Sequence, residues 1–334
     1  MSGDSTIVTP RDPAERLVVR VARSRSDRLY RGVATGAGLV TLLLMGLIGG
    51  FLLVKGWEAL RIAGWSFFTS TSWLPDQGGA FGIASVLAYT AQIALVAIVI
   101  AVPVSILTSL FITDYCPAAL RRPLTTAVDL LAAVPSLIYG LWGLFFLQPR
   151  LLGLSKWLAD HLGFIPFFHV SAPAPRPLSL FPGSTFIAGV IVSLMVVPIC
   201  TSVMREVFSQ TPNGEKEGAL ALGGTRWGVV RDVVLPFGRG GVIGGTMLGL
   251  GRALGETIAV TLVISVSFDP SNSIIGQGSN SIASLIALKF SESNTTGISA
   301  LMAAGLVLFA ITLAVNSLAA LVVGRSRSGE STEI

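Results

Sequence analysis

Residues 217–236 read EGALALGGTRWGVVRDVVLP, a polar and charged stretch between two long apolar segments. Gly223 and Gly224 let the backbone reverse with positive φ at low cost, so the pattern predicts a short helix, a tight turn and a second helix. Pro236 is expected to end the second helix, because proline removes a helical hydrogen bond. We therefore predict a small, rigid helical element that projects from the apolar segments and carries an exposed apolar tip.

Side chains around this turn agree with the helix–turn–helix interpretation. Thr211 or Asn213 is placed to cap the first helix and Thr225 to cap the second, while the helix dipole favours the two glutamates of the first turn. Three apolar residues are spaced to share one face of the second helix: Trp227, Val230 and Val234. The element could lie in a groove of a partner protein. The residues expected to shape it and make that contact are Glu215, Glu217, Ala219, Leu222, Gly223, Gly224, Trp227 and Pro236.

The rest of the chain is strongly apolar. Hydrophobic residues make up 52% of it and charged residues 12%, against about 25% charged residues in soluble domains. A helix of about 20 apolar residues crosses a bilayer, and such stretches occur at 32–54, 84–113, 124–147, 183–203, 240–267 and 298–322. We predict an all-α, polytopic membrane protein with a basic segment 1–31, a six-helix membrane domain 32–322 that includes the loop 204–239, and a tail 323–334. Pro103 and Pro135 are candidate kinks.

Lysine and arginine are unevenly divided between the two sides that six spans define. Most of them lie in segment 1–31, near residue 121, in loop 204–239 and in the tail, which all share one side. The positive-inside rule places that side in the cytoplasm, so we predict a multi-pass protein of the cytoplasmic (inner) membrane with both termini inside. The net charge of +5 reflects this bias and predicts no nucleic-acid partner. Segment 1–31 is either an amphipathic helix on anionic membrane lipid or a solvated tail.

The outer connections differ in composition. Residues 148–182 contain six prolines, which predicts an irregular, extended connection. Residues 55–83 are rich in Trp and Phe, as is typical of an interfacial aromatic belt, and contact with an extracytoplasmic partner is the alternative. Cys116 and Cys200 fall toward the cytoplasmic side, where we expect no structural disulfide. His161 and His169 stand apart from other metal-ligating residues, so we expect no metal site.

The fifth apolar segment repeats glycine every four residues, at Gly241, Gly245 and Gly249 and again at Gly251 and Gly255. Small residues at this spacing let membrane helices pack closely. The sequence contains no G-x-x-x-x-G-K-[ST] phosphate loop, the motif that would indicate a nucleotide site. We therefore expect a transport subunit that is not itself an enzyme and binds no cofactor.

The same segment holds an ionisable pair, Arg252 and Glu256. Residues four apart share a helix face, and Arg252 lies about 18 Å along the helix from Gly240, near the membrane midplane. A charge there costs about 2.5–3.5 kcal/mol and must face a cavity or a partner. Two interpretations stay open: a structural ion pair, or a site on an anion's path where the guanidinium takes two oxygens at once and Glu256 orients it. Thr257 and Thr261 would add hydroxyl donors.

These motifs resemble those of ABC-importer permeases. Six residues reproduce the spacing of the loop by which such permeases contact their ATPase, namely Glu217, Ala219, Gly223, Val233, Leu235 and Pro236. Gly218 stands where the family pattern has alanine. With AAVPSLIYGLWG (132–143) and GLGRALGETIAV (249–260), the chain resembles the PstC-type permease of the phosphate-specific ABC importer over about residues 28–322.

The resemblance implies the type I ABC-importer permease fold and a subunit that translocates inorganic phosphate by alternating access, with Arg252, Glu256 and Thr257 on the substrate path. It also implies partners: a second permease of PstA type, two ATPase subunits that hydrolyse ATP with Mg²⁺, and an extracytoplasmic phosphate-binding protein. The alternatives are an ABC permease for another oxyanion or small solute, and a secondary transporter or channel. The loop 204–239 argues against the last, because a carrier without an ATPase needs no such element.

Overall fold

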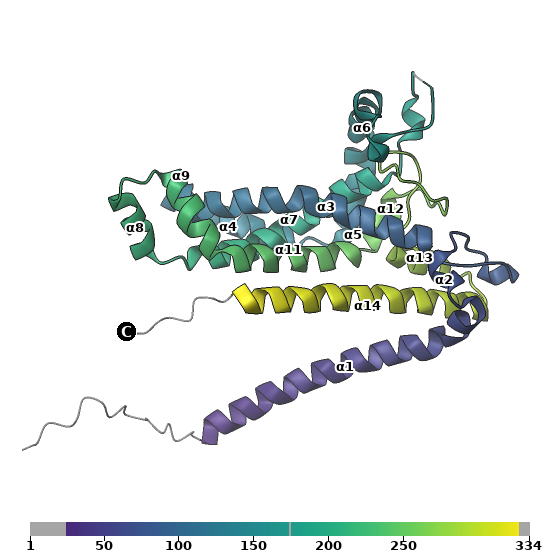
Figure 1. Cartoon of the computed structure of the whole chain (residues 1–334), viewed down its shortest axis with the longest axis horizontal. Helices are drawn as coiled ribbons and strands as arrows, with labels where there is room; N and C mark the ends of the chain where they lie inside the picture. The colour runs from purple at the N-terminus through teal and green to yellow at the C-terminus, as the bar shows by residue number, and fades with distance from the viewer. Residues whose placement is uncertain (1–24, 174, 327–334) are drawn as a thin grey trace, which may run out of the picture. The chain divides into compact units, whose positions relative to one another are not determined.

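The computed structural model describes residues 25–173 and 175–326, so most of segment 1–31 and of the tail 323–334 lies outside the described residues. The described part is helical, and its only β-type pairings are two isolated bridges, Trp73–Phe81 and Val266–Ser279. In chain order (Figure 1) the helices are α1 (Arg25–Ala63), α2 (Ser66–Thr69), α3 (Ala84–Leu110), α4 (Ala118–Ala133), α5 (Ser136–Trp142), α6 (Gln148–Leu162), α7 (Thr185–Ser209), α8 (Asn213–Ala221), α9 (Arg226–Val229), α10 (Leu235–Phe237), α11 (Arg239–Leu254), α12 (Ile258–Val263), α13 (Ile282–Lys289) and α14 (Thr295–Ser326).

Three π-helical turns join or extend these helices. The turn η2 (Phe111–Tyr115) continues α3, η3 (Gly143–Leu147) connects α5 to α6, and η6 (Val230–Val234) connects α9 to α10. Such turns contain one residue more than an α-helical turn, and they occur frequently at functional sites. One of the three, η6, lies within the stretch 217–236 that the sequence singles out, and η2 contacts Lys216 just before it through Asp114.

The chain forms two units, Met1–Gly50 and Phe51–Ile334. The described part of the first unit is the beginning of α1, whose apolar side chains are largely exposed. In the second unit, the last turns of α1 are fixed to α14. There, Ser299 Oγ donates a hydrogen bond to Lys55 O at 2.8 Å and accepts one from the Ala59 N–H at 3.1 Å.

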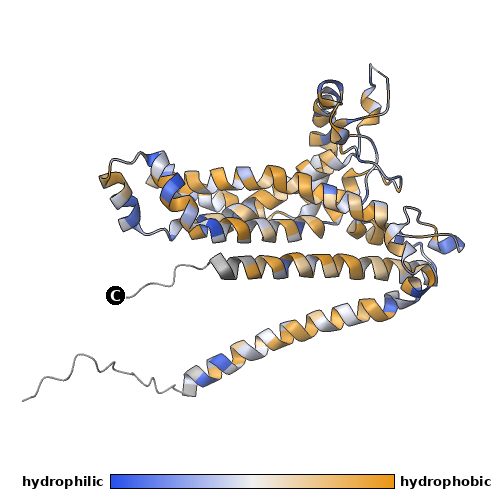
Figure 2. Ribbon diagram, viewed as in Figure 1, coloured by the Kyte–Doolittle hydropathy of each residue, from blue (hydrophilic) through white to orange (hydrophobic). Residues whose placement is uncertain are grey.

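Five helices in the described residues are long and apolar enough to cross a membrane: Arg28–Ala63, Ala84–Tyr115, Ser136–Leu162, Thr185–Ser209 and Thr295–Leu321. A sixth crossing results if the pair Arg226–Phe237 and Arg239–Leu254, bent by 66°, counts as one broken span. Figure 2 shows the long helices as mostly hydrophobic, with hydrophilic residues gathered in the short helices and connections. The expected all-α, polytopic architecture is confirmed.

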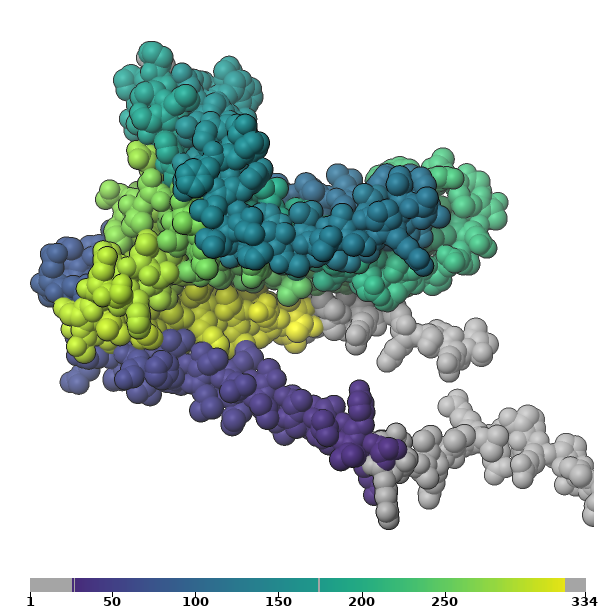
Figure 3. Space-filling model, turned by 180° about the vertical axis from the view of Figure 1, so that it is seen from behind, coloured from purple at the N-terminus to yellow at the C-terminus, as the bar shows by residue number. Residues whose placement is uncertain are grey.

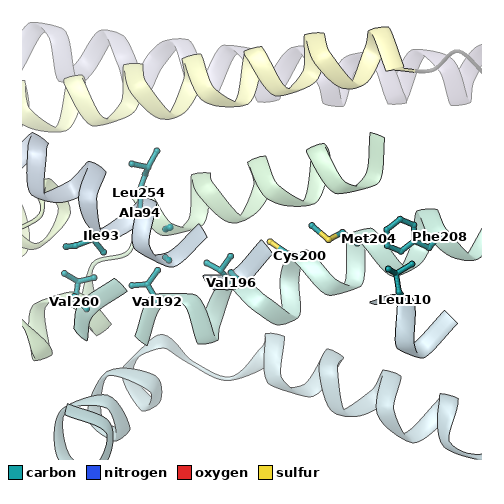
Figure 4. Close-up of a cluster of buried hydrophobic side chains, with 14 of the residues drawn as sticks. Ile93, Ala94, Leu110, Val192, Val196, Cys200, Met204, Phe208, Leu254 and Val260 are labelled. Atoms are coloured by element: carbon teal, nitrogen blue, oxygen red, sulfur yellow. The ribbon is translucent and has the colours of Figure 1, made fainter. Parts of the chain in front are cut away.

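The core of the larger unit is formed where α3, α7 and α11 pack together. Figure 4 shows buried side chains of α3 and α7, among them Ile93, Val196 and Cys200, meeting in this cluster. A Cβ on Gly249 of α11 would lie 2.6 Å from Cys200 Sγ and 2.7 Å from Val196 Cγ1. Only a glycine therefore allows this approach, as the small-residue spacing predicts.

The third apolar segment does not form the span predicted at 124–147. Helix α4 stops at Ala133, Val134 and Pro135 are extended, and a new helix runs from Ser136 through η3 and α6 to Leu162. The predicted boundaries were wrong because the residue before a proline is disfavoured in the helical region. Pro135 therefore separates two helices instead of bending one.

The first part of the proline-rich connection is an α-helix of 15 residues, so the prediction of an irregular connection over 148–182 was wrong there. Helix α6 occupies Gln148–Leu162, and Pro149 lies in its first turn, where a missing N–H costs no helical hydrogen bond. The described residues of 163–182 contain only short 3-10 turns, Pro166–Phe168 and Leu178–Leu180, as their prolines predict.

The aromatic residues of the connection 55–83 have two different roles. Phe67, Trp73 and Phe81 are buried against α13 and α14, whereas Trp57 and Trp65 are 60% and 78% exposed. Only the exposed ones are available to a membrane interface. The others form a second hydrophobic cluster that holds α2 and the following turn against the helices.

Candidate functional site

The projecting element predicted at 217–236 comprises α8, a glycine turn, α9, η6 and α10, and ends at Gly238. Gly223 has φ +86°, the left-handed conformation that the turn was predicted to need. Gly224 has no positive φ, but a Cβ there would lie 2.6 Å from Ala219 O. Thr225 caps α9 as predicted, because its Oγ1 accepts a hydrogen bond from the Gly228 N–H at 3.1 Å.

Two local predictions for this element were wrong. Neither Thr211 nor Asn213 caps α8, whose N-cap residue is Pro212 without a side-chain hydrogen bond. Thr211 is instead buried, and its Oγ1 has no hydrogen-bond partner among the residues that the structure describes. Pro236 does not end the second helix. It lies in the first turn of α10, where proline is tolerated, and the helical path breaks two residues later at Gly238.

The apolar tip of the element is exposed. Leu222 is 92% exposed, Trp227 59% and Leu220 47%. Val230 and Val234 are buried in the core cluster, whereas Trp227 is exposed, so the three side chains do not form one exposed apolar face. Glu215 and Glu217 are exposed and engage no other described residue. The element thus presents both an apolar tip and two carboxylates for contact with another protein.

The fifth apolar segment is interrupted at the ionisable pair. Helix α11 ends at Leu254, residues 255–257 are not helical, and α12 starts at Ile258. Arg252 and Glu256 therefore do not share the face of one continuous helix, as the spacing predicted, but face each other across a break. Their Nη2 and Oε2 atoms lie 3.5 Å apart. Non-helical backbone at membrane depth is tolerated only where protein or a cavity surrounds it.

The two side chains of the pair differ in their surroundings. Glu256 is 5% exposed, and its Oε1 accepts a hydrogen bond from the Ala259 N–H at 3.2 Å, so it caps the first turn of α12. The Arg252 side chain is 46% exposed, and Glu256 is its only charged partner among the described residues. A buried carboxylate that holds a half-exposed guanidinium leaves the other guanidinium N–H groups open to an anion.

The hydroxyl groups near this break are already bonded within the chain. Thr257 Oγ1 donates to Gly255 O at 3.2 Å. Thr261 Oγ1 donates to Thr257 O at 2.7 Å and lies 2.8 Å from Ser284 Oγ. Thr257 is therefore adjacent to the pair, but both hydroxyls stabilise the broken backbone. Arg252 is the principal group at the break that is available to a ligand.

The projecting element and the break at residues 255–257 belong to one bundle but lie at different places along it. Figure 1 shows α8 and α9 at one end of the packed helices α3, α7 and α11, and α12 and α13 toward the other end. The space-filling view from behind (Figure 3) shows α6 standing out from the bundle at the end away from α8. Helix α11 runs from the projecting element to Arg252, so it connects the two candidate sites directly.

The sequence did not indicate one contact of the projecting element. Lys216 Nζ lies 2.7 Å from Asp114 Oδ1, a pairing of residues 102 positions apart. The only available sign was an acidic residue at the end of the second apolar segment. Asp129, near the start of the third predicted segment, pairs with Arg205 at 3.5 Å and accepts a hydrogen bond from Ser202 Oγ at 3.0 Å.

Comparison with known proteins agrees with this architecture. Residues 115–328 match the family model described as binding-protein-dependent transport system inner membrane component. The phosphate transport system permease protein PstC 2 of Mycobacterium tuberculosis is 43% identical over 317 residues, covering 93% of this chain and 95% of that protein. The phosphate transport system permease protein PstC of Xylella fastidiosa is 43% identical over 305 residues, covering 90% and 92%.

A solved structure also shares the fold. A chain of a bacterial alginate ABC transporter, in complex with an alginate-bound periplasmic protein, superposes with a TM-score of 0.53 at 16% identity, covering 87% of this chain and 96% of that one. The helical bundle, the family match and the relatives lead to one conclusion. The chain belongs to the binding-protein-dependent transport system inner membrane components and, within them, to the PstC permease family.

Proposed function

We propose that this chain is a permease subunit of a phosphate-specific ABC importer and moves inorganic phosphate across the cytoplasmic membrane by alternating access. The names of its relatives support phosphate as the substrate. The observation that carries the proposal is the half-exposed Arg252 at the break between α11 and α12, held by a buried Glu256. A planar guanidinium binds two phosphate oxygens at once.

Phosphate contact at Arg252 is transient in this mechanism. An intramembrane cation lowers the cost of moving an anion through the apolar region, and the Glu256 carboxylate limits how tightly the guanidinium holds it. The broken backbone at 255–257 allows α11 and α12 to change their relative angle. The site then opens to one side of the membrane and afterwards to the other. Thr257 keeps the break in shape and contributes little to anion binding.

The driving force comes from partner subunits. We propose that the element formed by α8 and α9 docks on an ATPase subunit through Leu220, Leu222 and Trp227, with Glu215 and Glu217 at the edge. Two ATPase subunits hydrolyse ATP with Mg²⁺, and this chain itself binds no cofactor. A PstA-type permease forms the second half of the path, and an extracytoplasmic phosphate-binding protein delivers the substrate. The lysine and arginine distribution supports a cytoplasmic docking element and cytoplasmic termini.

Another oxyanion is the second candidate substrate. The guanidinium of Arg252 does not distinguish phosphate from other tetrahedral oxyanions, because all of them present paired oxygens. Competition for uptake by sulfate and arsenate separates these substrates. A secondary transporter is disfavoured, because the chain belongs to a family of binding-protein-dependent transport systems.

Uptake of phosphate into vesicles that contain the whole complex tests the role of Arg252. Arg252→Gln keeps size and donors but loses the charge, so we expect uptake to fall to background while the complex assembles. Arg252→Lys keeps the charge without the planar fork, and we expect partial uptake. Glu256→Gln can still accept the Ala259 N–H, so its effect should be milder. Arg239→Gln, on the same helix and without a described partner, is the matched control and should transport normally.

The same series separates anion contact from a structural ion pair. A purely structural pair leaves one charge stranded in each single variant, which costs about 3–5 kcal/mol. Both single variants would then assemble poorly, and the double variant Arg252→Gln/Glu256→Gln would recover assembly and uptake. Recovered uptake in the double variant refutes anion contact at Arg252.

A further inference from the structure

The first turn of α8 is bound to the end of α3 by a short ion pair. Lys216 Nζ lies 2.7 Å from Asp114 Oδ1, and the two side chains are 20% and 14% exposed. Asp114 belongs to the π-helical turn η2, which continues α3. By contrast, the neighbouring surface pair Arg231–Asp232 spans 3.9 Å with both side chains largely exposed. Screening by water weakens an exposed pair much more than a partly buried one.

The carboxylate of Asp114 is oriented by its own segment. Its Oδ2 accepts a hydrogen bond from Thr113 Oγ1 at 2.7 Å. Arg121, on α4, donates to Thr113 O at 2.9 Å, which ties η2 to the next helix. Lys216 therefore meets a preformed acceptor rather than a freely rotating side chain, so the pair transmits displacement instead of absorbing it.

Helix α8 has one attached face and one free face. Lys216 pairs with Asp114, and Ala219 packs on the core cluster. The two residues are three positions apart and hence lie on one side of the helix. Glu217, Leu220 and Leu222 are exposed. A partner that presses on the free face must therefore push the attached face against the end of α3.

We propose that the Lys216–Asp114 pair is a positioning contact that couples the docking element to α3. The proposal rests on the proposed docking of an ATPase at α8. Chain connectivity alone would carry motion of α8 through α9 and α10 into α11. The ion pair adds a second connection, into α3, which packs against both α7 and α11 and hydrogen-bonds α7 through Ser105 Oγ and Val197 O at 3.1 Å. Helices α3 and α7, which pack beside α11, thus move together with α8.

The ratio of phosphate transported to ATP hydrolysed tests this contact. The whole complex is reconstituted in vesicles with phosphate and the binding protein, and both rates are normalised to assembled complex. We expect Asp114→Asn and Lys216→Met each to lower the ratio by about threefold to tenfold, the size of effect seen for directly interacting residues. The double variant should be no worse than the more affected single variant, because both changes remove the same contact. Lys289→Met, which removes an ion pair with Glu292 at 3.0 Å far from α8, should leave the ratio unchanged.

Several outcomes overturn the proposal. An unchanged ratio in both single variants does so, even if less complex assembles, because a pair that only stabilises the fold changes the amount and not the ratio. Losses that multiply in the double variant also overturn it. Glu217→Arg, on the free face of α8, tests the underlying docking separately and should weaken ATPase association. If that association is unaffected, the docking role fails; if it weakens while the pair variants keep a normal ratio, only the positioning contact fails.

Discussion

At the scale of single residues, the ionisable pair of the fifth apolar segment leaves one of its two side chains, Arg252, accessible. Glu256 is buried, but it is compensated by Arg252 and by the N–H of Ala259. An unpaired buried carboxylate would carry a large desolvation cost. Because Glu256 has two partners, Arg252 is oriented without being enclosed. The proposed transient binding of an anion rests on this asymmetry rather than on the presence of an ion pair as such.

A residue-scale prediction concerns Gly249, where α11 approaches α7. A methyl group there would lie 2.6 Å from Cys200 Sγ, so Gly249→Ala should destabilise the complex by about 1–3 kcal/mol through overpacking. At Gly255 the nearest atom, Gly251 O, would be at 3.5 Å, an ordinary contact, and Gly255→Ala is the control. Thermal unfolding of the purified complex measures both. Equal melting temperatures for the two variants would contradict the close packing of these helices.

At the scale of elements, the docking helices are rigid at their base and exposed at their tip. Ala219, Val229 and Val230 contribute to the core cluster, while Leu222 at the turn is almost fully exposed. An apolar side chain in that position gains stability only by burial against another surface. The turn at Gly223 fixes the direction in which Leu222 points, so the turn conformation should control the contact with the ATPase.

An element-scale prediction follows for this turn. Gly223 has φ +86° and open space around it, so Gly223→Val introduces only backbone strain, about 1–2 kcal/mol for a left-handed residue with a side chain. We expect ATPase association to weaken by about tenfold. Gly218→Ala lies inside α8 with no atom near its Cβ and should strengthen the helix without loss of association. Binding of purified ATPase to the reconstituted permease measures both, and unchanged affinity of Gly223→Val would exclude a role for the turn.

At the scale of the larger unit, α11 connects the two candidate sites, and α3 and α7 pack along it. The docking helices are at one end of this bundle, and the break beside Arg252 lies further along α11. Motion applied at the docking end therefore has a continuous helical path to the proposed anion site. The proposed docking of an ATPase requires this end of the bundle to face the compartment that holds ATP.

A prediction at this scale tests the orientation in the membrane. Phe164, beyond α6, is 80% exposed, and Leu222 is 92% exposed, whereas Asp160 and Lys216 are held in ion pairs. Phe164→Cys should react with an impermeant thiol reagent in intact cells, and Leu222→Cys only after the membrane is opened. Cys116 and Cys200 are both buried and should give a low background. The reverse labelling pattern would invert the topology and remove the docking role.

The local features of the chain were readable from its sequence. Most of the apolar segments, the left-handed glycine at 223, the cap at Thr225 and the glycine face of α11 followed from composition and spacing, whereas the third segment, predicted at 124–147, begins at Ser136. Predictions failed where the same residue type is compatible with two local structures. Pro135 was read as a kink but separates α4 from α5, and Pro236 was read as a stop but fits the first turn of α10, because proline's effect depends on its position within the helical path.

The sequence by itself determined the helical class, the number of apolar segments, the projecting element and the nearness of Arg252 to Glu256, since each depends on residues close together in the chain. Only the tertiary structure decided that α11 ends before Glu256, that Glu256 is buried while Arg252 is half exposed, and that Lys216 reaches Asp114. These outcomes depend on contacts between segments up to 102 residues apart. Packing between such segments, rather than local helical preference, decides which side chains are buried and which helical backbone hydrogen bonds are not formed.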